Sequence, residues 1–143
     1  MLVAEIMSTD LVTCPAGTSL QTAAGRLLEN GVGSVIVEDE DQPVGIVTET
    51  DLIHAGYVTE RPFTEIPTRK VMSRPLRTIS PGKTLREATR RMKEENIKKL
   101  VVVEEMDVAG ILTAQDIIRS YPELRSEITD IVHPPQRRDF EGI

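Results

Sequence analysis

The hydrophobic positions of this chain switch between a strand-like and a helix-like period. Leu11–Cys14 is a predicted strand that ends at Pro15–Gly17. After a predicted N-cap at Ser19, apolar residues recur at i, i+3, i+4, i+7 and i+8, which places them on one face of a helix. Asn30-Gly31 is typical of a helix end, because glycine readily adopts the left-handed conformation found there. The apolar stripe consists of Leu20, Ala23, Ala24, Leu27 and Leu28.

Two further apolar runs and a second helix complete the unit. Ser34–Val37 and Val44–Val47 are predicted strands, and the acidic turn Asp39–Pro43 between them indicates a hairpin. The second of these strands runs into Thr48-Glu49-Thr50-Asp51, where a hydroxyl precedes a carboxylate by three residues, as in a capping box. The predicted order is strand, helix, strand, strand, helix.

The chain contains two copies of this predicted unit. Shifted by 65 residues, the sequence falls on itself without a gap, with Met7-Ser8 on Met72-Ser73 and Gly45-Ile46 on Gly110-Ile111. The segment Ala55–Arg69 is predicted to connect the two copies. Further matched pairs are Thr13 and Thr78, Arg26 and Arg91, Thr48 and Thr113, and Asp51 and Asp116.

The second copy predicts the same elements as the first. Thr84-x-x-Glu87 is a capping box that starts a helix at Leu85, and the strands Leu100–Val103 and Val108–Leu112 flank the turn Glu104–Asp107. One unit of this size would be marginal alone. We therefore predict an α/β fold of two tandem β-α-β-β-α units, related by a pseudo-twofold axis and packed sheet to sheet. The predicted boundaries are 1–65 and 66–121 for the units and 122–143 for a C-terminal helix and tail, helical through Val132 and exposed over Pro134–Arg138.

Composition and charge narrow the function classes. Hydrophobic residues make up 39% and charged residues 28% of the chain, which is ordinary for a soluble protein. No apolar run approaches the roughly 20 residues of a membrane span, and the first residues lack the features of a signal peptide. The single cysteine predicts a reducing cytoplasm. The net charge of −6 argues against non-specific nucleic-acid binding, and because residues 1–65 carry 11 acids and 2 bases, an anion site is expected in the second half.

Catalytic and metal-binding chemistry finds little support in the residues. Cys14 stands at a strand end without a second cysteine or a nearby histidine, so a small buried hydrophobe is favoured over a nucleophile. His54 and His133 lack ligand spacing, so no metal is expected. A glycine-rich phosphate loop, a serine–histidine–aspartate set and a clustered acid pair are all missing from the sequence. We expect a protein that is not an enzyme and has no cofactor.

Four motifs recur in the same order and at the same spacing in both copies. They are Ile6-Met7, Ser19-Leu20 with Ala23-Ala24, Gly31-Val32-Gly33-Ser34-Val35 and Gly45-Ile46-Val47-Thr48-x-x-Asp51-Leu52 in the first copy, and Val71-Met72, Thr84-Leu85 with Ala88, Ile97-Lys98-Lys99-Leu100-Val101-Val102 and Gly110-Ile111-Leu112-Thr113-x-x-Asp116-Ile117 in the second. Each motif alone is weak, but the ordered set resembles a tandem pair of cystathionine β-synthase (CBS) domains. The resemblance covers about residues 1–121.

The resemblance implies a regulatory module that binds adenosine-containing ligands in clefts between the paired domains. In that family the threonine of the last motif contacts phosphate and the aspartate holds the ribose hydroxyls. Many members carry arginine just before this aspartate, where this chain has Thr50 and Gln115. The implied phosphate and ribose residues are Thr48, Asp51, Thr113 and Asp116, and the implied adenine-lining residues are Thr13, Cys14, Val32, Gly33, Thr78, Ile79, Ile97 and Lys98.

Elementary chemistry favours the same site. A strand that runs into a helix start brings free backbone N–H groups and the positive end of the helix dipole to one point, which suits phosphate. A carboxylate can accept from both hydroxyls of a ribose. The alternative is that Thr48 and Asp51 only cap their helix, which requires no ligand.

Basic residues of the second copy also allow two interpretations. Lys98 and Lys99 enter the second strand, where side chains alternate, so one of them would face the cleft and could contact phosphate. The alternative is a solvated strand end. Arg86, Arg90 and Lys93 lie at i, i+4 and i+7 and are expected to form a solvated helix face.

Two hypotheses from different classes follow. The first is a sensor of AMP, ADP, ATP or an S-adenosylmethionine-like metabolite, in which the ligand changes the pose of the units or of a homodimer and an effector protein responds. A homodimer is implied by the resemblance, since relatives associate through their helices. The second is a ligand-free dimerisation or scaffold module that regulates a partner protein. A nucleic-acid regulator is disfavoured by the acidic charge.

Overall fold

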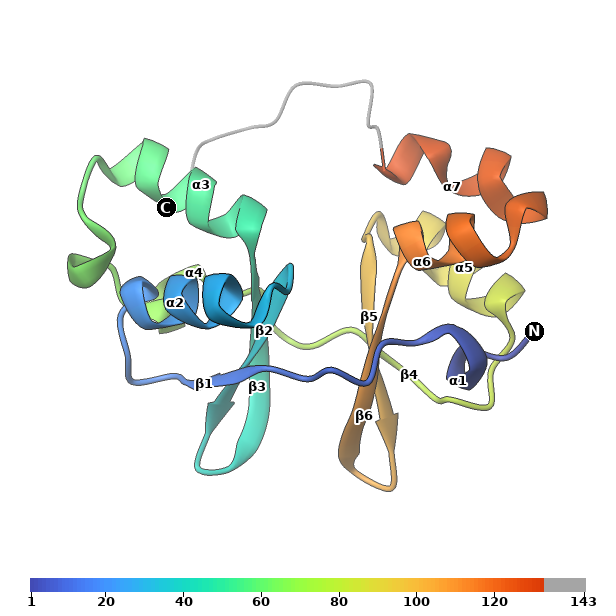
Figure 1. The fold of residues 1–143 in the computed structure, drawn as a ribbon, viewed down its shortest axis with the longest axis horizontal. Coiled ribbons are helices and arrows are strands. Elements are labelled where there is room, and N and C mark those ends of the chain that lie inside the picture. Colours follow the sequence, from blue (N-terminus) through green and yellow to red (C-terminus); the bar gives the residue numbers. More distant parts are fainter. Residues whose placement is uncertain (133–143) are drawn as a thin grey trace. The chain divides into compact units, whose positions relative to one another are not determined.

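The computed structural model describes residues 1–132 of the chain. The predicted order of strand, helix, strand, strand, helix is confirmed in both copies (Figure 1). The predicted exposed end Pro134–Arg138 lies outside the described residues. The elements are α1 Val3–Ile6, β1 Thr13–Pro15, α2 Leu20–Asn30, β2 Ser34–Asp39, β3 Gln42–Thr48, α3 Glu49–Thr59, the 3-10 turn η1 Phe63–Glu65, α4 Thr68–Val71, β4 Thr78–Ile79, α5 Leu85–Glu95, β5 Lys99–Glu104, β6 Asp107–Thr113, α6 Ala114–Ser120, the 3-10 turn η2 Pro122–Leu124 and α7 Arg125–Val132.

Each copy folds around one three-stranded mixed sheet. In the first copy β1 runs parallel to β2, with Thr13 opposite Ile36, and β2 pairs antiparallel with β3, with Val35 opposite Val47. The second copy repeats this order as β4, β5 and β6. The α/β class with two tandem units is thereby confirmed, whereas the packing of one sheet on the other stays a prediction.

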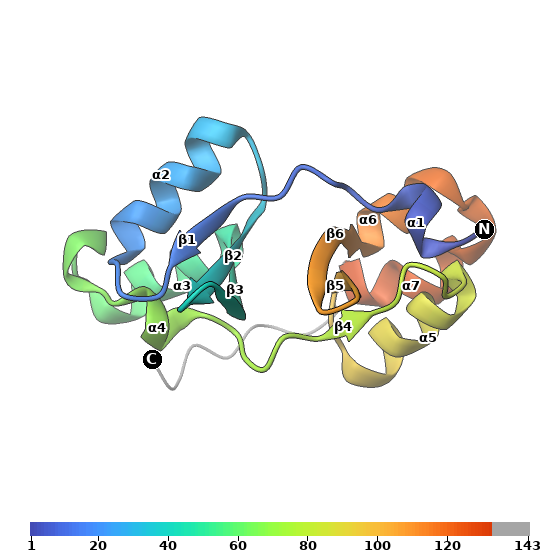
Figure 2. The same cartoon turned by 90° about the horizontal axis from the view of Figure 1, so that it is seen from below.

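Helices cover one face of each sheet and bury an apolar core there (Figures 1 and 2). The helices α2 and α5 end at left-handed residues, Gly31 and Asn96, with φ of 62° and 54°. This confirms the helix end predicted at Asn30-Gly31. The second copy has an additional element, α7, which packs on α5 and α6. The core residues that the helices contribute are Leu20, Ala23, Leu27, Leu52 and Ala55 in the first-repeat unit, and Val3, Leu85, Ala88, Met92, Ala114, Ile117 and Ile128 in the second-repeat unit.

The chain divides into two compact units that do not coincide with the two repeats. Within the described residues, the first-repeat unit is Leu11–Leu76, and the second-repeat unit combines Met1–Asp10 with Arg77–Val132. Each repeat therefore gives its opening segment to the unit of the other repeat. The predicted boundary between residues 65 and 66 therefore separates the two sequence repeats and not the two compact units.

The exchanged segments are held by the two motifs that marked the duplication. Ser8 and Ile111 exchange two backbone hydrogen bonds, both with N···O distances of 2.9 Å. Ser73 and Ile46 do the same at 2.9 and 3.1 Å. The Met-Ser motif of one repeat thus pairs with the Gly-Ile motif of the other.

The connector differs from its predicted extent over Ala55–Arg69. Ala55 is fully buried, and α3 continues past it to Thr59. The chain then returns to the core of the first-repeat unit, where the carbonyl of buried Ile66 accepts from the amide of Leu20 at 2.8 Å. Most of the segment is therefore part of the folded unit, because its apolar residues complete the core.

Candidate functional site

Each unit carries the same hydrogen-bonded helix start after its last strand. The amide of Thr48 donates to Oδ2 of Asp51 at 2.9 Å, and the amide of Asp51 donates to Oγ1 of Thr48 at 3.2 Å. The corresponding distances between Thr113 and Asp116 are 3.0 and 3.1 Å. Both Thr-x-x-Asp motifs therefore form complete capping boxes.

Capping uses only part of the polar capacity of these side chains. It engages Oδ2 of each carboxylate and one lone pair of each hydroxyl, so Oδ1 and the hydroxyl proton are left over by the cap. All four side chains are half-buried. The geometry is therefore compatible with a residue that caps its helix and contacts a ligand at the same time.

The helix starts offer fewer free backbone donors than the sequence pattern suggests. The amide of Glu49 donates to the carbonyl of Gly33 at 3.3 Å, and the amide of Ala114 donates to that of Lys98 at 2.8 Å. The amide of the third helical residue is occupied by the cap. A phosphate here would depend on the remaining second amide, the threonine hydroxyl and nearby side-chain charge.

Strand register brings the start of the second strand beside the motif. Ser34 lies opposite Thr48, and Lys99 lies opposite Thr113. The predicted residues Val32, Gly33, Ile97 and Lys98 come immediately before these pairs. Lys98 is exposed and Lys99 is half-buried, so the two lysines differ in environment, as the alternation predicts.

The first-strand candidates divide into polar and core residues. Thr13 is half-buried and Thr78 is exposed, whereas Cys14 and Ile79 are buried in the cores of their units. Burial raises the pKa of the Cys14 thiol, an effect that nearby Arg26 partly opposes. This environment agrees with a small buried hydrophobe, and contact of these residues with adenine stays a prediction.

One repeated pair of residues received no role from the sequence. Arg26 of α2 donates from Nη1 to the carbonyl of Thr13 at 2.5 Å, and Arg91 of α5 donates to the carbonyl of Thr78. Each arginine thus holds the start of the first strand from the following helix. The equivalence of Arg26 and Arg91 at a shift of 65 residues was the available signal.

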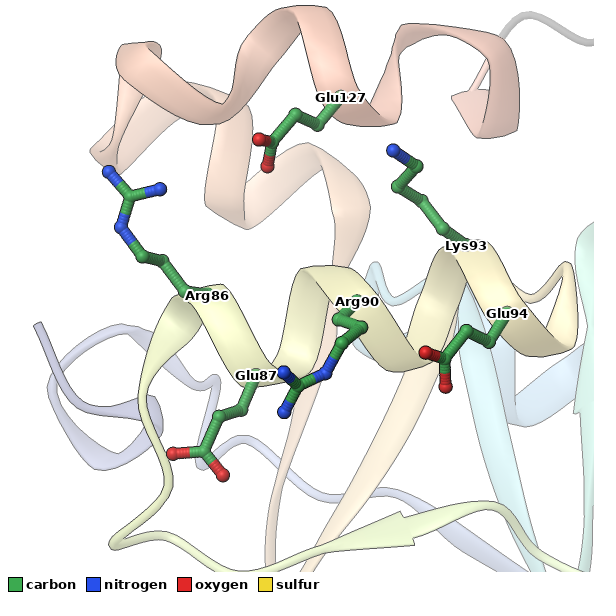
Figure 3. A pocket seen from close by; sticks show the side chains of 6 residues that line it. All are labelled: Arg86, Glu87, Arg90, Lys93, Glu94 and Glu127. Carbon is green, nitrogen blue, oxygen red and sulfur yellow. The ribbon is translucent and has the colours of Figure 1, made fainter.

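Arg86, Arg90 and Lys93 of α5 are exposed, as predicted for a solvated helix face, and this face borders a hollow. A hollow of about 420 Å³ lies between α5 and α7 in the second-repeat unit, and Figure 3 shows charged side chains of both helices around it. Three bases and three acids line it, so its formal charges balance and it is not an anion site by charge alone. The lining residues are Arg86, Arg90, Lys93, Glu87, Glu94 and Glu127.

Residues 1–132 contain neither a membrane-spanning helix nor a cluster of metal ligands. None of the helices there combines the length and the apolar character that a bilayer crossing requires. Within the same range, histidine, cysteine and acidic side chains do not gather in groups of three that could hold a metal ion. His133 lies outside this range.

Comparison with known proteins identifies the repeated unit. The family model of the CBS domain matches residues 3–57 and again residues 68–123. The uncharacterized protein MK0525 of Methanopyrus kandleri is 33% identical over 131 residues, which cover 90% of this chain and 66% of that protein. Two other uncharacterized proteins, MJ1404 and MJ0653 of Methanocaldococcus jannaschii, are matched over 32% and 63% of their lengths. The chain therefore spans two thirds or less of these relatives.

Two solved structures share the fold and a modest identity. The CBS domain protein TA0289 of unknown function from Thermoplasma acidophilum is 26% identical with a TM-score of 0.82, over 93% of this chain and 75% of that one. The CBS domain pair of protein MJ0100, solved in complex with 5′-methylthioadenosine and S-adenosyl-L-methionine, is 25% identical with a TM-score of 0.75, over 86% and 97%. Tandem domains of this kind thus form most of the described fold, and α7 lies beyond the second match.

Proposed function

Because the chain belongs to the CBS-domain family and contains two CBS domains, we propose that it is a regulatory module that binds adenosine-containing ligands. The ligand-contacting residues would be Thr48 and Asp51 in one repeat and Thr113 and Asp116 in the other. The observation that carries this proposal is the pair of capping boxes, which leaves a carboxylate oxygen and a hydroxyl proton at the same place in both repeats. A ribose diol and a phosphate oxygen supply the matching partners.

The related pair from protein MJ0100 supports the adenosyl class of ligand. That protein was solved with 5′-methylthioadenosine and S-adenosyl-L-methionine, both of which contain an adenosine with a free ribose diol. For this chain we propose AMP, ADP, ATP or an S-adenosylmethionine-like compound. Energy sensing and an effector protein belong to the same proposal, in which the bound ligand shifts the population of two poses.

Calorimetric titration of the chain with AMP, ADP, ATP, S-adenosylmethionine and 5′-methylthioadenosine tests this function. We expect heat of binding and a rise in melting temperature for at least one of them, because a ligand that binds only the folded state stabilises it. Guanosine monophosphate serves as the control, since it keeps the ribose and phosphate but changes the base. If none of the adenosyl compounds produces heat or a thermal shift, the ligand-free scaffold module is the better account.

We also propose that the chain forms a homodimer through α2 and α3 of the first-repeat unit. Leu28 on α2 and Ile53 and Tyr57 on α3 are 84%, 72% and 64% exposed, although large apolar side chains are usually covered. In the second-repeat unit the equivalent helices carry α7 against them. The exposed helix pair is therefore the surface of the first-repeat unit best suited to self-association.

Ile53→Glu should convert such a dimer to a monomer, because it places a charge in the apolar interface. Sedimentation velocity measures the change directly. Met106→Glu is the matched control, since Met106 is 85% exposed at the tip of the β5–β6 hairpin and outside this surface. Equal sedimentation of wild type and Ile53→Glu would exclude this interface.

The remaining expectations stand as predictions of the same proposal. The chain is predicted not to be an enzyme, to be located in the cytoplasm and to bind no nucleic acid. Its net charge of −6 supports the last of these.

A further inference from the structure

The two repeats place different charges at one equivalent hydrogen bond of their candidate sites. In the first repeat the amide of Glu49 donates to the carbonyl of Gly33, and in the second the amide of Ala114 donates to the carbonyl of Lys98. The donors Glu49 and Ala114 are 65 residues apart in the sequence, and so are the acceptors Gly33 and Lys98, so the two hydrogen bonds are equivalent in the repeats. The first therefore carries a carboxylate opposite a glycine, and the second carries a methyl group opposite an ammonium group.

This difference lies beside the residues proposed to hold the ligand. Glu49 follows Thr48 directly, and Lys98 precedes Lys99, which lies opposite Thr113 in the sheet. Each repeat also has its motif aspartate and an arginine bound to the first strand, whereas Lys99 has the uncharged Ser34 as its counterpart. Glu49 in the first repeat and Lys98 and Lys99 in the second, whose counterparts Ala114, Gly33 and Ser34 are uncharged, therefore change the formal local charge by three units between the two sites.

Neighbouring ion pairs leave this difference in place. In the second repeat Arg77 pairs with Glu95 at 3.0 Å, and Arg91 pairs with the same carboxylate at 2.8 Å. Among residues 1–132, the ion pairs join Arg69 to Asp39, Arg77 and Arg91 to Glu95, and Lys83 to Glu87, whereas Glu49 and Lys98 are both exposed. Their charges can therefore act on a bound ligand, with the salt dependence expected of exposed groups.

We propose that the two sites select adenosine ligands by charge. The Thr113–Asp116 site would take an adenosine 5′-phosphate, attracted by Lys98. The Thr48–Asp51 site would take an adenosine whose 5′-substituent carries no negative charge, because Glu49 repels phosphate there. This inference rests on the proposed function and adds the ligand class of each site.

The test is calorimetry of the full chain with AMP and with 5′-methylthioadenosine. Asp116→Asn should abolish most AMP binding, whereas Asp51→Asn should abolish most 5′-methylthioadenosine binding. Asparagine is used because it can still accept the capping hydrogen bond, so both variants are expected to fold. Added salt should weaken AMP binding and leave the uncharged ligand nearly unaffected.

The charge assignment is tested by changing Lys98 and Glu49 themselves. Lys98→Ala should weaken AMP binding about two- to fivefold, as expected for loss of an exposed charge partner. Glu49→Ala should admit AMP to the first site, seen as a second equivalent bound. Lys93→Ala is the control, because Lys93 lies in the same unit and lines the hollow between α5 and α7.

The outcomes separate this inference from the proposed function. If AMP and 5′-methylthioadenosine bind both sites alike, or if Lys98→Ala matches Lys93→Ala, selection by charge is wrong while the adenosyl-binding module stands. If the unmodified chain binds neither ligand nor any of the other adenosyl compounds, both proposals fall.

Discussion

Gly110→Ala is expected to destabilise the second-repeat unit by about 1–3 kcal/mol, the usual cost of an added carbon where no space exists. A Cβ at Gly110 would lie 2.6 Å from the carbonyl oxygen of Ser8 and 2.9 Å from Sδ of Met7. The Ser8 carbonyl cannot simply move aside, because it accepts the hydrogen bond from the amide of Ile111. The added methyl group should therefore weaken the attachment of the exchanged segment Met1–Asp10.

Chemical denaturation followed by circular dichroism measures the stability change, and limited proteolysis of the N-terminal segment reports its release. Gly82→Ala is the matched control, since a Cβ there would meet nothing within 4 Å. Gly45→Ala should be milder than Gly110→Ala, because a Cβ there would lie 3.0 Å from the equivalent carbonyl oxygen, that of Ser73, and its closest contact at 2.7 Å is a side-chain atom, Sδ of Met72. A Gly110→Ala protein that unfolds at the same denaturant concentration as Gly82→Ala would show that this close approach is not needed.

Replacing Asp116 should separate the capping role from the ligand role. Asp116→Asn keeps an oxygen for the amide of Thr113 but removes the charge, so we expect little change in stability and about a 10- to 100-fold loss of AMP affinity. Asp116→Ala also removes the acceptor of the Thr113 amide, while the amide of residue 116 can still donate to Oγ1 of Thr113, so a further loss of about 1 kcal/mol of folding stability is expected. Thermal unfolding and calorimetry on the same samples give both quantities.

Asp51→Asn provides the corresponding change in the other repeat. Asp51 forms the same capping box with Thr48, at 2.9 and 3.2 Å. The effect of Asp51→Asn on stability should therefore match that of Asp116→Asn. Any difference in ligand affinity between the two variants then arises from the ligand contacts of the two aspartates and not from a difference in helix capping. Unchanged AMP affinity in both variants would leave helix capping as the complete role of these aspartates.

Much of the fold could be predicted because its signals are local. The apolar stripe from Leu20, the helix end at Gly31 and the two Thr-x-x-Asp boxes each depend on residues within a few positions of one another. The predicted N-cap at Ser19 shows the limit of such signals. Ser19 occupies the cap position without a capping hydrogen bond from its side chain, whereas Thr84, its counterpart, forms one at 3.1 Å.

The candidate site was only partly accessible to the same reasoning. The threonine and aspartate of each motif could be assigned because they lie three residues apart. The occupied amides of Glu49 and Ala114 could not, since their acceptors, the carbonyls of Gly33 and Lys98, lie just before the neighbouring strand and far outside the motif in sequence. The hollow beside Arg86, Arg90 and Lys93 was missed because its second wall, α7, lies about 35 residues further along the chain.

By itself, the sequence determined the duplication, the order of elements in each repeat and the paired capping motifs. Only the tertiary structure decided that the opening segment of each repeat folds with the other. The physical reason is that the repeats carry the same pairing motifs, so Met7-Ser8 matches Gly45-Ile46 as well as it matches Gly110-Ile111. Chain connectivity and packing break that symmetry, and the structure pairs Ser8 with Ile111 and Ser73 with Ile46.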